Sequence, residues 1–405
     1  MTVSSMLERI NDLLAQVTVP ADWAVATVVS VTGSVPREPG STMFVHRDGT
    51  TIGSLSGGCV EAAVVDAALT ALTTDRAELV GFGDADGTGF DVALTCGGEL
   101  TVLVQPLNQL AGVLPGLRAI AERSPDGALD GALDDAISLV RALPGSTVPL
   151  PGPFLVRDGD ALPTVRVPGL PERATGDLAA ALRSGVTTTV PVFGPPEAGC
   201  PELGRLLVES RRSAARLLIY GANDHAAALA RLARPLGWQV TVCDTRPVFA
   251  TARRHPDAHD IVVQSPVDHL EAEAAAGRVD GRTAVVVLGH DPRFDLAVLD
   301  RALRLGLAYV GAMGSRTTDG RRRQDLLAGG LPAHLLASLH SPIGLDLGAR
   351  TPPEVAVSVL AEIIAVTRRP DRRPAAHQLR DTTGPVHATP AFVSAAGRED
   401  RFSWT

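Results

Sequence analysis

A cysteine beside two glycines stands at the head of a predicted helix in SLSGGCVEAAVVDAAL, residues 54–69. The backbone N–H groups of such a Gly57-Gly58 turn, together with the helix N-terminus, form an anion-binding concavity. A thiol placed there has a lowered pKa and therefore more nucleophilic, metal-binding thiolate. Cys59 is thus a candidate ligand-binding thiol, and the alternative is a small packing residue beside a tight turn.

A second cysteine carries the same elements in reverse order. In DVALTCGGEL, Cys96 precedes Gly97 and Gly98. Two thiols in glycine turns of one domain could face the same ligand. The segment GSVPREPGS adds a flexible loop in which the Arg37 guanidinium is suited to a phosphate group.

The segment YGANDHA lies where a dinucleotide-binding fold carries its phosphate fingerprint, between a predicted strand and a predicted helix. Gly221 fits that fingerprint, but Asn223 and Ala226 replace its second and third glycines. We expect Asn223 to crowd the close approach that a pyrophosphate requires. Asp244 ends the next predicted strand, where a ribose-binding carboxylate is expected, and Arg246 follows it closely.

Two more polar clusters follow later predicted strands. VVVLGHDPRFD places His290, Asp291 and Asp295 after one strand, and GAMGSR ends in Ser315 and Arg316 after the next. The carboxyl ends of parallel strands are where ligands of such folds bind. A glycine turn ending in arginine at that edge favours an anionic ligand.

Two other polar features have structural interpretations. Asp224 begins the helix after GAN, where it would repel a phosphate or serve as the N-cap. Glu354, Ser358 and Glu362 recur every fourth position along the last predicted helix, among apolar residues. This polar stripe predicts an edge of the helix that faces solvent.

Composition excludes several classes of protein. The chain has no lysine, so its 37 basic residues against 45 acidic ones are all arginine. Walker-type phosphate loops and Schiff-base chemistry both require lysine and are excluded. The arginines form no basic stripe of the kind that would predict nucleic-acid binding. No apolar run is long enough to span a membrane. The four cysteines form no CxxC pair, and the N-terminus lacks signal-peptide features, so we expect a reducing cytoplasm.

The elements that must position these residues change in character along the chain. Residues up to about 107 predict an α+β block, with TMFVHRDGTTIGSL as a hairpin closed at Asp48-Gly49. Residues 108–212 are less regular, with two helical stretches and a terminal linker. From residue 215, apolar strands alternate with helices, which is typical of a doubly wound parallel sheet. The predicted fold is therefore α/β: an N-terminal α+β domain with linker over 1–213, a Rossmann-like domain over 214–373 and a polar tail over 374–405.

Several of these motifs together resemble the XdhC/CoxI family. SVTGSVPREPGSTMFV, GSLSGGCVEAAV and LTCGGELTV are similar to its N-terminal half, whereas GHDPRFDLAVLDRAL, YVGAMGSR and PIGLDLGARTPPEVAVSVLAEIIA are similar to its Rossmann half. The resemblance implies an accessory chaperone that binds molybdenum cofactor (molybdopterin) and supports its sulfuration by a cysteine desulfurase. It would then deliver the cofactor to a molybdenum hydroxylase of the xanthine dehydrogenase or CO dehydrogenase type. The resemblance thus favours a maturation factor that carries a cofactor over an enzyme.

Cys59, a possible molybdenum contact, and Cys96 fall on the cysteine motifs of the family. The full set of candidate cofactor-binding residues is Arg37, Gly57, Gly58, Cys59, Cys96, Gly97, Gly98, Gly221, Asp244, His290, Ser315 and Arg316. Two positions depart from the family pattern: GANDHA stands where GAGHVA is usual, and Gly289 stands where a threonine usually precedes His290.

Two other functions remain open from the residues. An NAD(P)-dependent oxidoreductase would use Asp244 and Arg246 for the ribose and His290 for proton transfer. An interaction protein would hold a desulfurase or a hydroxylase without touching the cofactor. The protein could also act as a homodimer, which is the commonest assembly.

Overall fold

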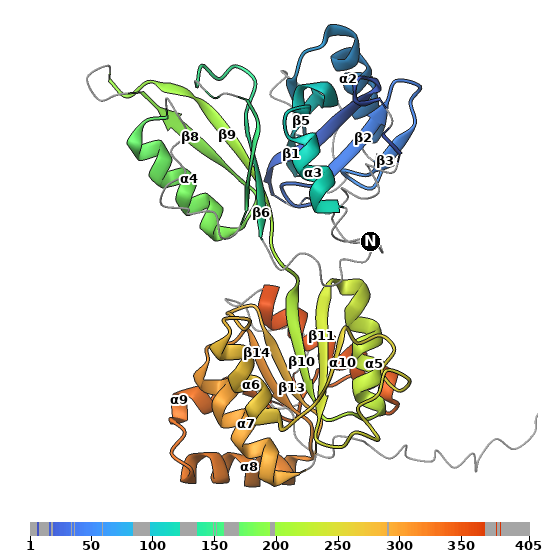
Figure 1. The fold of residues 1–405 in the computed structure, drawn as a ribbon, viewed down its shortest axis with the longest axis vertical. Coiled ribbons are helices and arrows are strands. Elements are labelled where there is room, and N and C mark those ends of the chain that lie inside the picture. Colours follow the sequence, from blue (N-terminus) through green and yellow to red (C-terminus); the bar gives the residue numbers. More distant parts are fainter. Residues whose placement is uncertain are drawn as a thin grey trace, which may run out of the picture. The chain divides into compact units, whose positions relative to one another are not determined.

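The chain of 405 residues divides into two compact units, 1–214 and 215–405, in a computed structural model (Figure 1). The first unit contains antiparallel sheets and the second a parallel sheet, which confirms the predicted fold class. The structure describes residues 6–7, 16–17, 19–33, 35, 37–58, 60–83, 98–121, 136–148, 150, 152–157, 170–194, 199–289, 291–368, 378 and 381.

The first sheet of unit 1 has the strand order β3-β2-β1-β5-β4, and every neighbouring pair is antiparallel. Its strands are β1 (Trp23–Thr32), β2 (Thr42–His46), β3 (Thr51–Gly53), β4 (Glu78–Phe82) and β5 (Glu99–Pro106). The hairpin predicted at Asp48-Gly49 is confirmed, because β2 pairs with β3 across that turn. Alternate residues of β1 face opposite sides of the sheet. Helix α2 (Glu61–Thr74) packs on one face, and η2 (Leu107–Leu110) and α3 (Leu114–Ala121) pack on the other.

A second antiparallel sheet in unit 1 corrects the expectation of a less regular segment before residue 213. It has the order β7-β6-β9-β8, with strands β6 (Ile137–Ala142), β7 (Phe154–Arg157), β8 (Thr188–Phe193) and β9 (Glu202–Arg211). Helix α4 (Glu172–Ser184) packs against it. Pro191 weakened the strand signal, yet it lies in the edge strand β8, where a missing N–H is tolerated.

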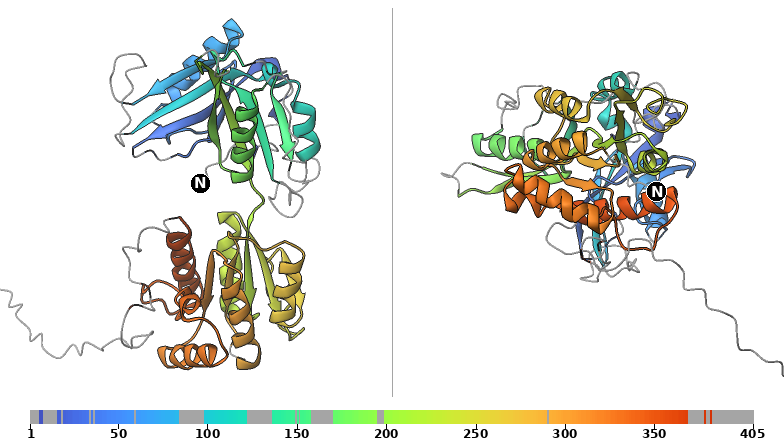
Figure 2. Two further views of the ribbon diagram at one scale, coloured as in Figure 1. Left: turned by 90° about the vertical axis from the view of Figure 1, so that its left-hand side faces the viewer. Right: turned by 90° about the horizontal axis from the view of Figure 1, so that it is seen from below.

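Unit 2 is built on a parallel sheet with helices on both of its faces (Figure 2). The sheet has six strands in the order β12-β11-β10-β13-β14-β15. The strands are β10 (Ala215–Tyr220), β11 (Trp238–Asp244), β12 (Asp260–Val263), β13 (Ala284–Val287), β14 (Tyr309–Ala312) and β15 (Leu339–His340). The chain proceeds from β10 to β11 on one side and returns to β13 on the other. The sheet therefore has a topological switch point beside β10, where such folds bind ligands.

Two groups of helices cover the two faces of this sheet. On one face, α5 (Asp224–Ala233) and α10 (Pro352–Arg368) pack against apolar side chains that include Leu217 and Ile219 of β10. The alternate residues Leu218 and Tyr220 pack with the helices of the other face, α6 (Pro266–Ala275), α7 (Pro292–Arg304), α8 (Arg316–Ala328) and α9 (Ala333–Leu336). In the described part of the chain, no helix has the length and apolar character needed to cross a membrane.

The polar stripe on α10 does not form a solvent-facing edge. Glu354 is exposed, but Ser358 and Glu362 are buried, and Glu362 has an exposed fraction of 0%. Its carboxylate accepts hydrogen bonds from the Tyr309 hydroxyl at 2.5 Å and from the Gly344 N–H at 2.7 Å, and lies 3.1 Å from His340 Nδ1. The prediction was wrong for Ser358 and Glu362 because their side of α10 packs against Tyr309, His340 and the 341–345 segment, whose polar groups need partners.

Candidate functional site

The three glycine-rich segments of unit 1 begin at the same edge of the first sheet, the edge formed by the ends of its strands. Thr32 at the end of β1 pairs with Glu99 at the start of β5, and Gly53 at the end of β3 pairs with Met43 near the start of β2. The connections over residues 33–41, 54–60 and 83–98 therefore all emerge at one edge. Cys59, Cys96 and Gly97 lie outside the described residues, and a ligand shared by the two thiols stays a prediction.

The 54–60 segment folds around the carboxylate of Glu61, the first residue of α2. This carboxylate accepts hydrogen bonds over 2.5 to 3.2 Å. The donors are the backbone N–H groups of Leu55, Ser56, Gly57, Gly58 and Val60 and the hydroxyls of Ser54 and Ser56. Partial burial alone would raise the pKa of Glu61, but hydrogen bonds from Ser56, Ser54 and the backbone outweigh burial and hold the pKa well below its usual range.

The anion-binding concavity expected at Gly57 and Gly58 therefore exists, but a carboxylate of the same chain fills it. Both glycines adopt left-handed backbone conformations, with φ of 88° and 126°, which other residues rarely adopt. Their N–H groups point at Glu61 and serve to shape the loop. The sequence contained a sign of this internal carboxylate, because Glu61 is the acidic residue nearest to the Gly57-Gly58 turn.

Arg37 is a cation on one of these connections, the one over residues 33–41. It is half-buried, and its Nε is buried without a hydrogen-bond partner among the described residues. The loop that carries it packs closely on the residue before β8, since a Cβ at Gly40 would lie 2.9 Å from Thr187 Oγ1. Gly98 is buried at the start of β5. An anchored loop with an unpaired guanidinium nitrogen suits an anionic group.

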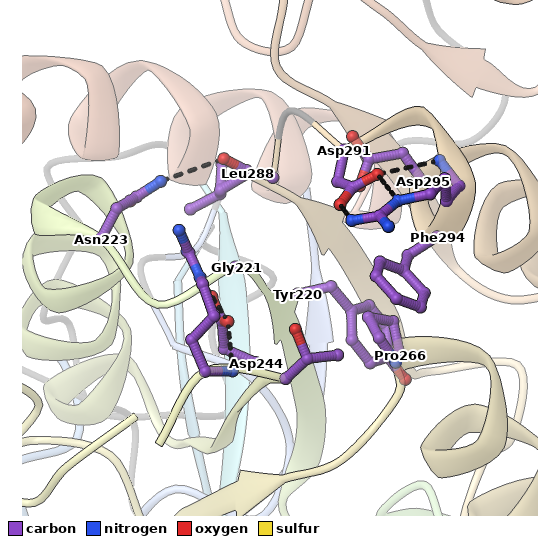
Figure 3. Close-up of a pocket in the computed structure, with 13 residues that line it drawn as sticks. Tyr220, Gly221, Asn223, Asp244, Pro266, Leu288, Asp291, Phe294 and Asp295 are labelled. Carbon is purple, nitrogen blue, oxygen red and sulfur yellow. Dashed lines mark hydrogen bonds and ion pairs between the residues drawn. The ribbon is translucent and has the colours of Figure 1, made fainter. Parts of the chain in front are cut away.

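Unit 2 contains a pocket of about 620 Å³ at the switch point of its sheet (Figure 3). Tyr220 and Gly221 line it from the end of β10, Asp244 from β11, Leu288 from the end of β13, and Asp295 from the first turn of α7. The pocket thus brings together two predicted residues, Gly221 and Asp244. This is the position at which open parallel sheets bind ligands.

Asp244 is already paired within the chain. Its carboxylate accepts a hydrogen bond from the Ala222 N–H at 2.8 Å, and from the N–H, Nε and Nη2 of Arg246 at 2.8 to 2.9 Å. Burial alone would raise the pKa of Asp244, but these hydrogen bonds hold the pKa below its usual value. Arg246 therefore occupies the carboxylate that a ribose would use in a dinucleotide site.

The GANDHA turn is closed by its own side chains. Gly221, with φ of 111°, cannot carry a side chain, because a Cβ would lie 2.6 Å from the Gly289 nitrogen. Asn223, and not Asp224, is the N-cap of α5: its Oδ1 accepts the Ala226 N–H at 3.0 Å. Its Nδ2 donates to the Leu288 carbonyl oxygen at 3.0 Å. Asn223 thus joins the ends of β10 and β13 and uses an N–H of the helix terminus.

The wall of the pocket formed by α7 carries two carboxylates in different states. Asp291 caps α7 and pairs with Arg293, whose Nε and Nη2 lie 2.9 and 2.6 Å from its oxygens, and this lowers the pKa of Asp291 to about 2. Asp295 is 8% exposed, and its burial raises its pKa to about 6, although the nearby charge of Arg322 opposes the shift. The sequence placed both carboxylates at this ligand-binding end of the sheet, although neither was in the set of candidate cofactor-binding residues.

The remaining predicted residues lie apart from this pocket or outside the described chain. Ser315 is the N-cap of α8, where its Oγ accepts the Thr318 N–H at 3.1 Å. Ser315 and Arg316 do not line the pocket. His290 lies outside the described residues, between Gly289 and Asp291, which both line the pocket.

The other cysteines are structurally distinct. Cys200 is exposed and free, whereas Cys243 is buried at the end of β11, where burial raises the pKa of its thiol to about 12. Cys243 is therefore a packing residue at neutral pH. Among the described residues, no group of His, Cys, Asp and Glu side chains is arranged to hold a metal ion.

Two family models match this chain, one in each unit. The model described as XdhC and CoxI family matches residues 20–83, and the one described as XdhC Rossmann domain matches residues 217–363. A protein of Bacillus subtilis (strain 168) described as a probable xanthine dehydrogenase subunit is 28% identical over 346 residues, which are 85% of this chain and 93% of that protein. The molybdenum cofactor insertion chaperone PaoD of Escherichia coli (strain K12) is 27% identical over 340 residues, 84% of this chain and 82% of that protein.

A solved structure agrees in fold. A crystal structure described as a xanthine dehydrogenase from Bacillus halodurans matches with a TM-score of 0.60 at 22% sequence identity, over 92% of this chain and 98% of that one. Both units of this chain thus have counterparts in the same order in known proteins. The chain belongs to the XdhC and CoxI family.

Proposed function

We propose that this protein is a chaperone that binds molybdenum cofactor and delivers it to a molybdenum hydroxylase apoenzyme. The observation that carries the proposal is the similarity to the molybdenum cofactor insertion chaperone PaoD, which extends over 82% of the length of that protein and through both units of this chain. A local similarity to one domain would support only a shared fold.

The chemistry of the first unit supports this cargo. Molybdenum cofactor presents a soft metal centre, a pterin and a phosphate, for which thiolates and arginines are suitable partners. Cys59 is the proposed principal contact and Cys96 the second, on connections that leave the same sheet edge as the Arg37 loop. In this scheme Glu61 does not bind the cargo, and it shapes the 54–60 segment around its own carboxylate.

The finer steps of the proposal concern exchange with partners. While the protein holds the cofactor, a cysteine desulfurase supplies the outer sulfur of its persulfide. A dithiol reductant provides two electrons and two protons, so that this sulfur becomes the sulfido ligand and the oxo ligand leaves as water. Transient docking on the hydroxylase of the xanthine dehydrogenase or CO dehydrogenase type then transfers the finished cofactor. We place these events in the cytoplasm, where thiols remain reduced.

Cofactor retention tests the proposal. The full chain is incubated with molybdenum cofactor and passed through gel filtration, and the pterin and molybdenum that elute with it are measured. Retention by the native chain and loss in Cys59→Ser, with a smaller loss in Cys96→Ser, is the expected result. Cys200→Ser is the matched control, because Cys200 is an exposed free thiol of the same unit.

Delivery requires a second measurement on the same samples. The loaded chain should activate an apo-hydroxylase in the presence of a desulfurase, and the unloaded chain should not. A well-folded native chain that retains neither pterin nor molybdenum would overturn the proposal. Equal retention by the native chain and Cys59→Ser would move the cofactor contact to another residue.

A further inference from the structure

We propose that the pocket of unit 2 binds a planar 2-amino-4-oxopyrimidine ring, which pterins and guanine share, through the carboxylate of Asp295. This site goes beyond the thiol contacts of the first unit. It rests on the proposed function only for the identity of the natural ligand, because the proposed cargo contains a pterin.

The groups that would bind a dinucleotide in this pocket are engaged with the chain itself. Both oxygens of Asp244 accept hydrogen bonds from Arg246, and one also accepts the Ala222 N–H, so a ribose would have to displace them. The Asn223 side chain caps α5 and uses the Ala226 N–H. Asp224, with a side chain 82% exposed, adds negative charge at the same helix terminus, which opposes a pyrophosphate.

Asp295 is the carboxylate of this pocket that carries no ion pair with another described residue. It lies in the first turn of α7, and a Cβ at Gly289 would lie 2.8 Å from its Oδ1, so the bare backbone of Gly289 leaves the space that this carboxylate fills. Both carboxylate oxygens of Asp291 already accept hydrogen bonds from Arg293, so Asp291 is less able to bind a ligand. Buried carboxylates seek donors, and a ligand can supply them.

The edge of a 2-amino-4-oxopyrimidine ring matches a carboxylate. The ring N–H and the adjacent amino N–H point in nearly the same direction, so two oxygens of one carboxylate accept both hydrogen bonds in a fork. Such a ligand is neutral, which suits a pocket where the acidic residues Asp244, Asp291 and Asp295 face the two cations Arg246 and Arg293.

Flat surfaces in the pocket favour a planar ligand. Phe294 lies beside Asp295 on the α7 side of the pocket, opposite Asp244 (Figure 3). Arg246 also lines the pocket. Asp244 fixes the plane of the Arg246 guanidinium, which lies over the Phe249 ring at 4.4 Å from the ring centroid. Aromatic rings and guanidinium planes are the surfaces on which proteins stack heterocyclic bases.

The charge of Asp295 gives the site a pH dependence. Burial raises the pKa of Asp295 to about 6, and the groups that act on it are Arg322 of α8, which lowers the pKa, and Asp291 at the start of α7, which raises it. The doubly accepting carboxylate is the form above that pKa. Affinity for the ring should therefore be about tenfold higher at pH 7 than at pH 5.

The test compares ligands that differ in one group. Dissociation constants of the full chain are measured for pterin and for lumazine, which has an oxygen in place of the 2-amino group, and for guanosine, inosine and NAD. Pterin should bind at least tenfold more tightly than lumazine, because lumazine loses a charge-assisted hydrogen bond. Asp295→Asn should lower the pterin affinity at least tenfold and should not lower the lumazine affinity, because the Asn amide can accept the ring N–H and donate to the 2-oxo oxygen of lumazine.

Asp300→Asn is the matched control, because Asp300 lies on the same helix and pairs with Arg304 at the exposed surface. It should behave as the native chain does. The comparison of pterin with lumazine needs no variant, so it decides the proposal even if Asp295→Asn misfolds. Tight binding of pterin alone identifies a pterin as the source of the ring, and equal binding of guanosine shows that the site recognises the shared ring; both support the proposal.

Equal affinities for pterin and lumazine, no binding of any probe, or NAD binding more tightly than pterin and guanosine would each overturn the proposal. The outcome is separable from that of the proposed function. Cofactor retention that depends on Cys59, without pterin discrimination, would remove the ring site alone. Pterin discrimination without cofactor retention would remove the chaperone function and leave the ring site.

Discussion

At the scale of single residues, the carboxylates of the two candidate sites have two different roles. Glu61 and Asp244 are saturated by donors of this chain, and each fixes the backbone of a glycine-containing turn. Asp295 faces a pocket and forms no ion pair with a described residue. A carboxylate with its hydrogen bonds satisfied shapes a site, whereas one that is buried with spare capacity can receive a ligand.

Replacing the charge of Glu61 should loosen the 54–60 segment. Glu61→Gln puts an amide nitrogen, a donor, among N–H groups that need acceptors, so the free energy of unfolding should fall by about 1 to 2 kcal/mol. The expected loss of stability is no larger because Glu61 is partly exposed, so water replaces some of the lost hydrogen-bond partners. Thermal unfolding and protease cleavage within residues 54–60 measure the effect.

The pH dependence of that difference follows from the lowered pKa of Glu61. The folded pKa lies below the unfolded one, so the stabilisation is present above the unfolded value of about 4.3 and is lost as pH falls through the folded pKa. The difference in the free energy of unfolding between the native chain and Glu61→Gln should therefore become smaller at acidic pH. Glu172→Gln is the control, because Glu172 is also the first residue of a helix but is exposed; an equal loss in both variants would contradict this role of Glu61.

At the scale of elements, α10 illustrates what periodicity can and cannot predict. The spacing of Glu354, Ser358 and Glu362 correctly places them along one side of a helix. It does not specify which part of the chain covers that side. Here the 341–345 segment supplies the Gly344 N–H and Leu345 carbonyl that Glu362 and Ser358 bind. Contacts between segments far apart in sequence leave no periodic signal in either one.

The buried position of Glu362 predicts a large effect of a small substitution. Glu362→Gln should lower the free energy of unfolding by about 3 kcal/mol, because it removes the charge that accepts bonds from Tyr309, His340 and Gly344 in a buried site. Glu354→Gln should cost less than about 1 kcal/mol, since Glu354 is an exposed cap of the same helix. Urea unfolding of both variants measures the difference. Similar losses in the two would restore the solvent-facing interpretation of the stripe.

The absence of a sequence signal for contacts between distant segments also explains the other differences between the predicted and the observed structure. Continuous apolar strands separated by helices were sufficient to predict the parallel sheet of unit 2. The sheet of β6 to β9 was missed because its strands are separated by long connections and contain Pro191. The N–H groups of Gly57 and Gly58 bind a carboxylate of the chain itself, and that Glu61 supplies it depends on where a side chain folds back, which the sequence pattern does not specify.

At the scale of the whole molecule, the two units carry different chemistry on different frameworks. The first presents loops at the edge of an antiparallel sheet, and the second presents a pocket at the switch point of a parallel sheet. Each unit encloses its own apolar clusters. A core that is complete within one unit allows that unit to fold alone.

Separation of the chain after residue 214 should therefore give two folded fragments. The fragment 215–368 includes both faces of the parallel sheet and every described residue that lines the pocket, so it should unfold cooperatively and keep the pterin affinity of the full chain within about threefold. Circular dichroism, gel filtration and the pterin titration measure these properties. The fragment 1–214, which lacks Asp295, should show no preference of pterin over lumazine. Because the pocket lies wholly within unit 2, a folded 215–368 fragment that failed to distinguish these two ligands would contradict the assignment of the ring to Asp295.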